Sequence, residues 1–103
     1  MIALLDARYP SHALKAVTQA FIAPDLPKRN PAIKELGTIG YSDEIGTRAV
    51  FLFDVPDAMI AEFLTTQSQR TAYISARAPG FACGVHVGQT VAEAIPALRP
   101  MYA

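Results

Sequence analysis

The sequence contains a single cysteine and no long apolar run. Cys83 has no second cysteine with which to form a disulfide, so the composition gives no indication of secretion. The apolar residues 1–5 are interrupted at once by Asp6 and Arg8, whereas a signal peptide needs about 7–15 apolar residues after a basic start. No stretch approaches the roughly 18–20 apolar residues that span a bilayer. We therefore expect a cytoplasmic protein that does not enter a membrane.

Charge is also scarce, and it is balanced. Nine basic and nine acidic residues give a net charge of zero, and only 17% of the residues are charged, against about a quarter in a typical globular protein. Nucleic-acid-binding domains usually carry a basic excess, so we predict no nucleic-acid partner. Because 51% of the residues are hydrophobic, we expect a partner to cover part of the surface. The length is that of one domain, residues 1–103.

The familiar motifs of metal, phosphate and nucleophile chemistry are missing as well. His12 and His86 do not have the spacing of a metal site, so we predict neither a metal nor a cofactor. We find no glycine-rich phosphate loop and no nucleophile elbow. These absences leave no motif from which an activity can be assigned.

What the sequence does contain is a succession of strand and helix patterns. Strands are expected over residues 2–9, 34–42, 47–55 and 81–88. A first helix is expected from Ser11, as its N-cap, to Pro24, with its buried face formed by Leu14, Val17 and Phe21. A second helix is expected from Pro56 to about residue 68; residues 69–78 are left open between helix, strand and irregular structure, and a short helix is expected from Thr90.

Between the first helix and the second strand lies a segment with three prolines, residues 24–31. Proline lacks an amide donor and fixes φ, so neither a helix nor a central strand fits this segment. We predict that it is the longest loop of the chain. Lys28 and Arg29 form an adjacent basic pair within it, and we interpret both as solvated side chains of this loop.

The element order is strand, helix, strand, strand, helix, strand. This order predicts a ferredoxin-like α+β fold, with a four-stranded antiparallel sheet in the spatial order 4-1-3-2 and both helices on one face. Side chains alternate along a strand, so Phe51, Phe53 and Cys83 are expected to face the helices. The opposite face, called the open face below, is then expected to carry Asp6, Arg8, Arg48, Asp54 and His86 among Leu4, Val50 and Leu52. A bare, half-apolar sheet face is an association surface, so we expect it to be covered.

The open face also holds the candidate site residues. Neighbouring antiparallel strands bring Arg48 close to Asp6 or Arg8, and we interpret an Asp6–Arg48 pair as a structural salt bridge. Tyr41 is within reach of a ligand on this face, with packing as the alternative interpretation. Two interpretations of His86 stay open: a hydrogen bond across a dimer interface, or a base or ligand contact in a pocket, since imidazole groups titrate near neutral pH.

Two segments resemble a known superfamily. Gly37–Tyr41 and then Ala49–Asp57, which includes Phe53-Asp54-Val55-Pro56 before a helix, are similar to small members of the dimeric α+β barrel superfamily, such as muconolactone isomerase-like proteins. The resemblance implies a homodimer whose two sheets face each other in a barrel. The superfamily includes cofactor-free monooxygenases, isomerases, dehydratases and haem-handling enzymes, and no catalytic residue of these maps onto this chain. RNA-recognition motifs share the element order, but their stacking aromatic residues lie on the open face. Here Phe51 and Phe53 are expected to face the helices, so we do not expect RNA binding.

Three hypotheses of function follow. The first is an uncharacterised homodimeric module that binds a small apolar or aromatic ligand between its two sheets. The second is a cofactor-independent isomerase or monooxygenase acting on a small cyclic compound, with His86 as its base and Asp6, Arg8 and Arg48 orienting an anion. The third is an interaction protein whose open face pairs with a different protein.

Overall fold

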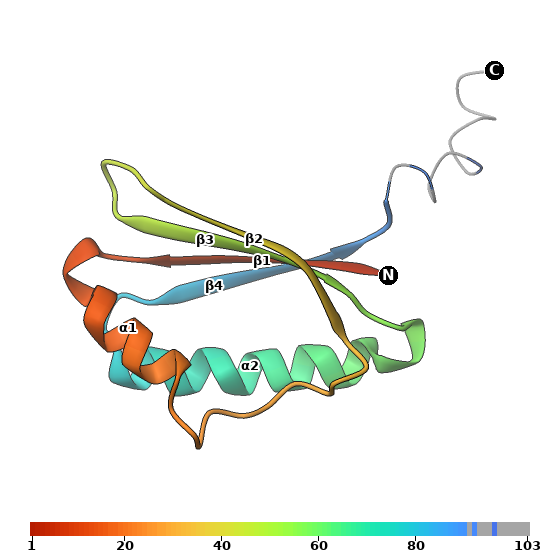
Figure 1. Cartoon of the computed structure of the whole chain (residues 1–103), viewed down its shortest axis with the longest axis horizontal. Helices are drawn as coiled ribbons and strands as arrows, with labels where there is room; N and C mark the ends of the chain where they lie inside the picture. The colour runs from red at the N-terminus through yellow and green to blue at the C-terminus, as the bar shows by residue number, and fades with distance from the viewer. Residues whose placement is uncertain (91, 93–95, 97–103) are drawn as a thin grey trace.

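The chain forms one four-stranded antiparallel sheet with two helices packed on one of its faces (Figure 1). The computed structural model describes residues 1–90, 92 and 96. In chain order the elements are β1 (Ile2–Tyr9), the 3₁₀ turn η1 (Ser11–Ala13), α1 (Leu14–Phe21), β2 (Lys34–Ser42), β3 (Thr47–Asp54), the 3₁₀ turn η2 (Asp57–Met59), α2 (Ile60–Arg77) and β4 (Ala82–Gly88). The helix expected from Thr90 falls largely outside the described residues.

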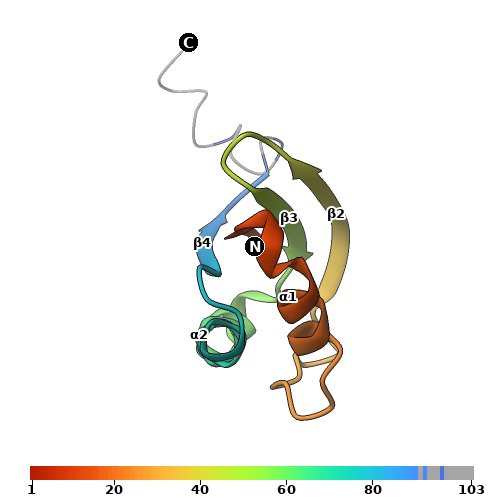
Figure 2. The ribbon, with the colours of Figure 1, turned by 90° about the vertical axis from the view of Figure 1, so that its left-hand side faces the viewer.

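The strand order across the sheet is β2-β3-β1-β4. Read from the β4 edge, this is the order 4-1-3-2 that the sequence predicts. The central strand β1 pairs antiparallel with both β3 and β4, so the first strand of the chain joins the two halves of the sheet. Figure 2 shows the sheet curving around the side on which α1 and α2 both lie. This α+β architecture is compatible with a ferredoxin-like fold.

The predicted alternation of side chains is confirmed along β1. Ala3, Leu5 and Ala7 are buried beneath the helices, whereas the residues between them are exposed or half-buried. On β3, Phe53 is buried and Phe51 packs against the same core, so both aromatic rings point inward as expected. The core therefore lies on the helix side of the sheet.

The first helix differs from its prediction at both ends. Ser11 is not an N-cap; it lies in η1, and no side chain caps that turn or α1. The regular helix stops at Phe21, three residues before Pro24. Leu14, expected on the buried face, is 53% exposed because the buried stripe runs through Ala13, Val17 and Ala20, which leaves Leu14 outside it.

The second helix is longer than predicted. It begins after η2 and continues through the open segment 69–78 as far as Arg77. Phe63, Gln67 and Ile74 are buried along its inner face, at spacings that keep them on one side of a helix. The polar Gln67 hides this stripe in the sequence. Its amide donates to the Thr71 hydroxyl at 3.1 Å and to the Cys83 sulfur at 3.6 Å, which satisfies the donor end of a buried side chain.

Phe63 joins α2 to the sheet and provides a test of this packing. It is 1% exposed and lies against Phe53 with 5.6 Å between the ring centroids. We expect Phe63→Ala to lower the free energy of unfolding by about 3–5 kcal/mol, because it leaves a cavity in the core. Urea denaturation measures this change. Leu64→Ala, one residue along the same helix and 39% exposed, is the control and should cost less than half as much; equal losses would contradict the described orientation of α2.

Candidate functional site

The open face carries the predicted site residues in a regular grid. Strand register aligns Ala82, Arg8, Arg48 and Tyr41 in a first row, followed by rows containing Gly84-Asp6-Val50-Ile39, His86-Leu4-Leu52-Gly37 and Gly88-Ile2-Asp54-Lys34. The two middle rows are apolar except for Asp6 and His86, and the other charged groups lie in the end rows. Ile39 is 67% exposed and Leu52 is 37% exposed. No described element covers this face.

Asp6 accepts hydrogen bonds from two arginines on the open face. Its Oδ2 lies 2.8 Å from Nη2 of Arg48 and 3.2 Å from Nη2 of Arg8. The predicted Asp6–Arg48 pair is therefore present. The hydrogen bond from Arg48, aided by that from Arg8 and opposed by burial, holds the pKa of Asp6 below its usual range, and the same bond raises the pKa of Arg48. One carboxylate faces two guanidinium groups, so the cluster has a net positive charge.

Tyr41 lies beside this cluster at the β2 side. The Arg48 guanidinium carbon is 5.8 Å from the centre of the Tyr41 ring, within the range of a cation–π contact. Tyr41 itself is 44% exposed. The structure thus brings Asp6, Arg8, Arg48 and Tyr41 together, and packing against Arg48 accounts for the position of the tyrosine.

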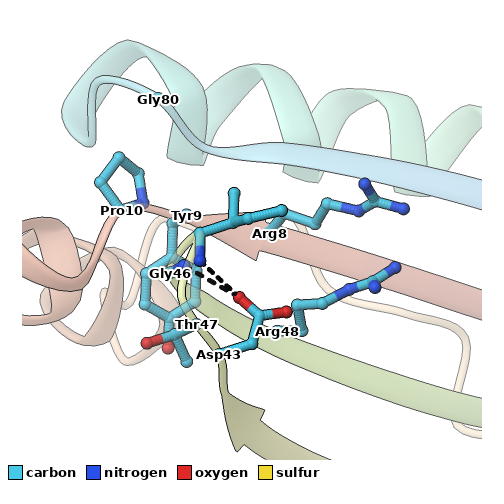
Figure 3. A pocket seen from close by; sticks show the side chains of 9 residues that line it. Arg8, Tyr9, Pro10, Asp43, Gly46, Thr47, Arg48 and Gly80 are labelled. Atoms are coloured by element: carbon cyan, nitrogen blue, oxygen red, sulfur yellow. Dashed lines mark hydrogen bonds between the residues drawn. The ribbon is translucent and has the colours of Figure 1, made fainter.

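A small cavity of about 180 Å³ adjoins the arginines at the turn between β2 and β3. Asp43 shapes this turn by accepting hydrogen bonds from the amides of Ile45 and Gly46. Gly46 has φ +152°, and a Cβ there would lie 2.6 Å from the Tyr9 carbonyl oxygen, so the turn requires glycine. Figure 3 shows the guanidinium ends of both arginines extending away from this turn along the strands. The aliphatic parts of the two arginine side chains therefore line the cavity, and their guanidinium groups point away from it (Figure 3).

His86 lies apart from the arginine cluster. It is exposed, pairs with Leu4 in the register and leans over Gly84, where a Cβ would be 3.7 Å from its Nε2. Four residues along the strand separate its row from the row of Arg8, a distance of about 13 Å. Within the described part of the chain it has neither a hydrogen bond nor an ion pair. A single chain does not bring His86 and the two arginines to one point.

The interpretation of Lys28 and Arg29 as a solvated pair is wrong for Arg29. Lys28 is exposed, but the Arg29 side chain turns beneath the sheet, where its guanidinium carbon lies 4.6 Å from the centre of the Phe53 ring. The loop that carries it is anchored by Leu26, which is buried in the core. Leu26 between prolines was the available signal that this loop packs inward, but the direction of Arg29 follows only from the tertiary structure.

The remaining candidates are structural or unreactive. Cys83 is a free thiol packed against the core, and burial raises its pKa, which disfavours the thiolate. His12 is exposed. Among the residues that the structure describes, no cluster of histidine, cysteine and carboxylate side chains could hold a metal ion. Over the same residues no helix has the length and apolar character needed to cross a membrane.

The Asp6 cluster makes stability depend on pH. A carboxylate whose pKa is lowered by folding stabilises the protein above its unfolded pKa of about 3.9, and this contribution disappears as the pH falls through the lower folded value. We expect Asp6→Asn to destabilise the protein at pH 7 and this deficit to shrink as the pH falls below about 3.9 towards the lower folded pKa of Asp6. Denaturant titrations between pH 7 and pH 2.5 measure the difference. Glu44→Gln, in the exposed turn, is the control; an Asp6→Asn deficit that is constant over this range would contradict the ion pair.

No protein-family model matches this chain, and no curated protein is found to be similar to it. The functional assignment therefore depends on the geometry of the two faces of the sheet.

Proposed function

We propose that the protein is a homodimer in which the open faces of two copies pack together, as in the dimeric α+β barrels, and hold a small apolar or aromatic ligand between them. The observation that carries this proposal is the contrast between the two faces of one sheet. The helices and the loop between α1 and β2 cover most of one face, whereas the other exposes a central apolar area, formed by Leu4, Val50, Leu52 and Ile39. Contiguous apolar area of this kind is typical of an interaction surface.

The distribution of charge on the open face favours a second copy of the same chain. Arg8 and Arg48 lie at one end of the grid, and Asp54 lies three rows away at the other end; the rows between are apolar along β3, where they contribute Val50 and Leu52. A two-fold axis that lies between the sheets and runs across their strands would place Asp54 of each copy over Arg48 of the other. Within the described residues Asp54 forms no ion pair, so it is available for this contact. The zero net charge of the chain also removes long-range repulsion between copies.

The β4 side of the same interface leaves room for a ligand. The open-face residues of β4 are Ala82, Gly84, His86 and Gly88, of which only the histidine has a large side chain. The axis described above sets β4 over β4, so two strands with little side-chain volume would face each other. A small apolar or aromatic molecule beside the two imidazoles would fill that space.

The isomerase or monooxygenase hypothesis depends on the same dimer. The two-fold arrangement sets His86 of the partner subunit over Gly84, one row from Arg8, whereas in one chain the separation is two rows. An imidazole base and an anion-orienting arginine would then approach each other only across the interface. Ligand binding is the simpler proposal because it does not require this convergence.

Leu52→Glu tests the interface directly. A carboxylate in the centre of the apolar rows would be buried by the dimer without a partner, so we expect the variant to be monomeric where the wild-type protein is dimeric. Sedimentation velocity at about 10–50 μM measures the mass in solution. Leu64→Glu, on α2, is the matched control, because its leucine is 39% exposed against 37% for Leu52, and it should remain dimeric.

The ligand requires a second readout. Native mass spectrometry of the purified wild-type dimer should detect a bound small molecule, and the Leu52→Glu monomer should lack it. A wild-type protein that is monomeric at these concentrations would contradict the dimer. A dimer that never carries added mass, even after incubation with small aromatic compounds, would leave the interface but contradict the ligand.

A further inference from the structure

A second cavity lies on the helix side of the sheet, under the loop that joins α1 to β2. Its volume is about 370 Å³, which is within the lower range of small-molecule sites. Figure 1 shows why space remains there: α1 lies beneath one end of the sheet only, and the chain after it runs back along α2 to the start of β2. The apolar part of its lining comes from α1, the loop and β3, namely Phe21, Ile33, Phe51 and Phe53, and charged and polar side chains of the loop, β2 and α2 form the rest.

Arg29 enters this cavity from the loop. Its guanidinium group lies over two aromatic rings, 4.6 Å from the centre of Phe53 and 5.3 Å from that of Phe63. Its Nη1 is buried without a hydrogen-bond partner, and within the described residues Arg29 has no carboxylate at ion-pair distance. Arg29 is half-buried, and we expect this placement to lower stability unless something compensates its charge, because removing a cation from water without an ionic partner is costly.

Arg70 brings a second positive charge to the same cavity. It extends from α2, donates one hydrogen bond to the Pro27 carbonyl oxygen at 2.7 Å, and lies 5.9 Å from the centre of the Phe21 ring. Burial lowers the pKa of Arg29 to about 10, with a further contribution from the charge of Arg70, and burial also lowers the pKa of Arg70. The charge of Arg70 therefore makes Arg29 harder to keep charged, although both remain cations at neutral pH.

One carboxylate lines the cavity but pairs with neither arginine. A β-bulge between Glu35 and Gly37 inserts Leu36 into β2, which sets Glu35 opposite the inward-facing Phe53. The Glu35 carboxylate accepts a hydrogen bond from the Thr38 hydroxyl. Its field favours the charged form of Arg29 only weakly, as the last of the contributions to that pKa. With Lys28 at the rim, the cavity has more positive than negative charge.

From this arrangement we infer that the cavity binds a small organic carboxylate with an aromatic or apolar body. The carboxylate would lie between Arg29 and Arg70, where guanidinium groups offer planar pairs of N–H donors to carboxylate oxygens. The body would lie against Phe21, Phe51 and Phe53. The site is formed by one chain, so it is independent of the proposed dimer and of any ligand between the sheets.

The experiment compares 1-naphthoate with its neutral analogue 1-naphthamide by ¹H–¹⁵N NMR titration of the intact protein. We expect naphthoate to bind at least about tenfold more tightly than naphthamide, because charge-assisted hydrogen bonds contribute about 1.5–3 kcal/mol. Shifts should be centred on the loop before β2 and on the Arg29 and Arg70 side chains. Equal affinities of the wild-type protein for the two compounds would overturn the inference.

Substitutions distinguish the contribution of Arg29 to naphthoate binding from that of the rest of the cavity. Arg29→Met removes the charge but keeps an unbranched side chain over the rings; it should lose the preference for naphthoate while retaining or gaining thermal stability. Arg77→Met is the control, because it removes the same positive charge from an exposed position on α2. It should bind naphthoate with the affinity of the wild-type protein. Unchanged naphthoate affinity in Arg29→Met would contradict the site. The Leu52→Glu monomer should also bind naphthoate; loss there would place the binding between sheets and overturn the inference.

Discussion

The structure depends on one constraint: two helices can cover only one face of a four-stranded sheet. Leu5, Phe53 and Phe63 pack between that face and α2, and they fix which side of every strand points inward. Because side chains alternate along β1, the burial of Ala3, Leu5 and Ala7 forces Leu4, Asp6 and Arg8 to the other side. The composition of the open face is thus a direct consequence of core packing. A shift of one residue in the register of β1 would exchange the side chains that face the helices with those on the open face.

The same constraint accounts for the cavity beneath the sheet. Eight residues of α1 extend about 12 Å, whereas the eight or nine residues of β1–β3 extend about 27–30 Å. The first helix therefore leaves much of the β2–β3 half uncovered, and the loop after it must fill the remainder. Leu26 anchors that loop in the core, and Arg70 and Tyr73 of α2 bind it through Pro27 and Asp25. A loop packs less densely than a helix, and the space left over is lined by phenylalanines.

Much of the architecture could be predicted from the sequence because it follows from short-range patterns. The strands 34–42 and 47–55 agree with β2 and β3 to within one residue, and the Asp6–Arg48 pair follows from alternation and antiparallel pairing. The extent of α2 could not be predicted, because Gln67 interrupts its apolar stripe and is accommodated only by Thr71 and Cys83. The site beneath the sheet was missed for a similar reason. Nothing local distinguishes an arginine that turns inward from a solvated one, and the bulge at Leu36 that redirects Glu35 is a property of the pairing with β3.

Arg48 and Arg29 have contrasting environments on the two faces of the sheet. On the open face Arg48 has a carboxylate at 2.8 Å, and its pKa is raised. Beneath the sheet Arg29 has aromatic rings and a second guanidinium group as neighbours, and its pKa is lowered. The first arrangement pairs its opposite charges within one chain, although Asp6 Oδ1 and Arg48 Nε are buried without a hydrogen-bond partner among the described residues. We expect the second to contribute less to stability than an apolar residue of the same length would, because Arg29 is half-buried, its Nη1 has no hydrogen-bond partner and it forms no ion pair within the described residues. An anion supplied from outside the chain would provide that compensation, which is the physical reason to treat the cavity beneath the sheet, and not the arginine cluster above it, as a binding site for a charged ligand.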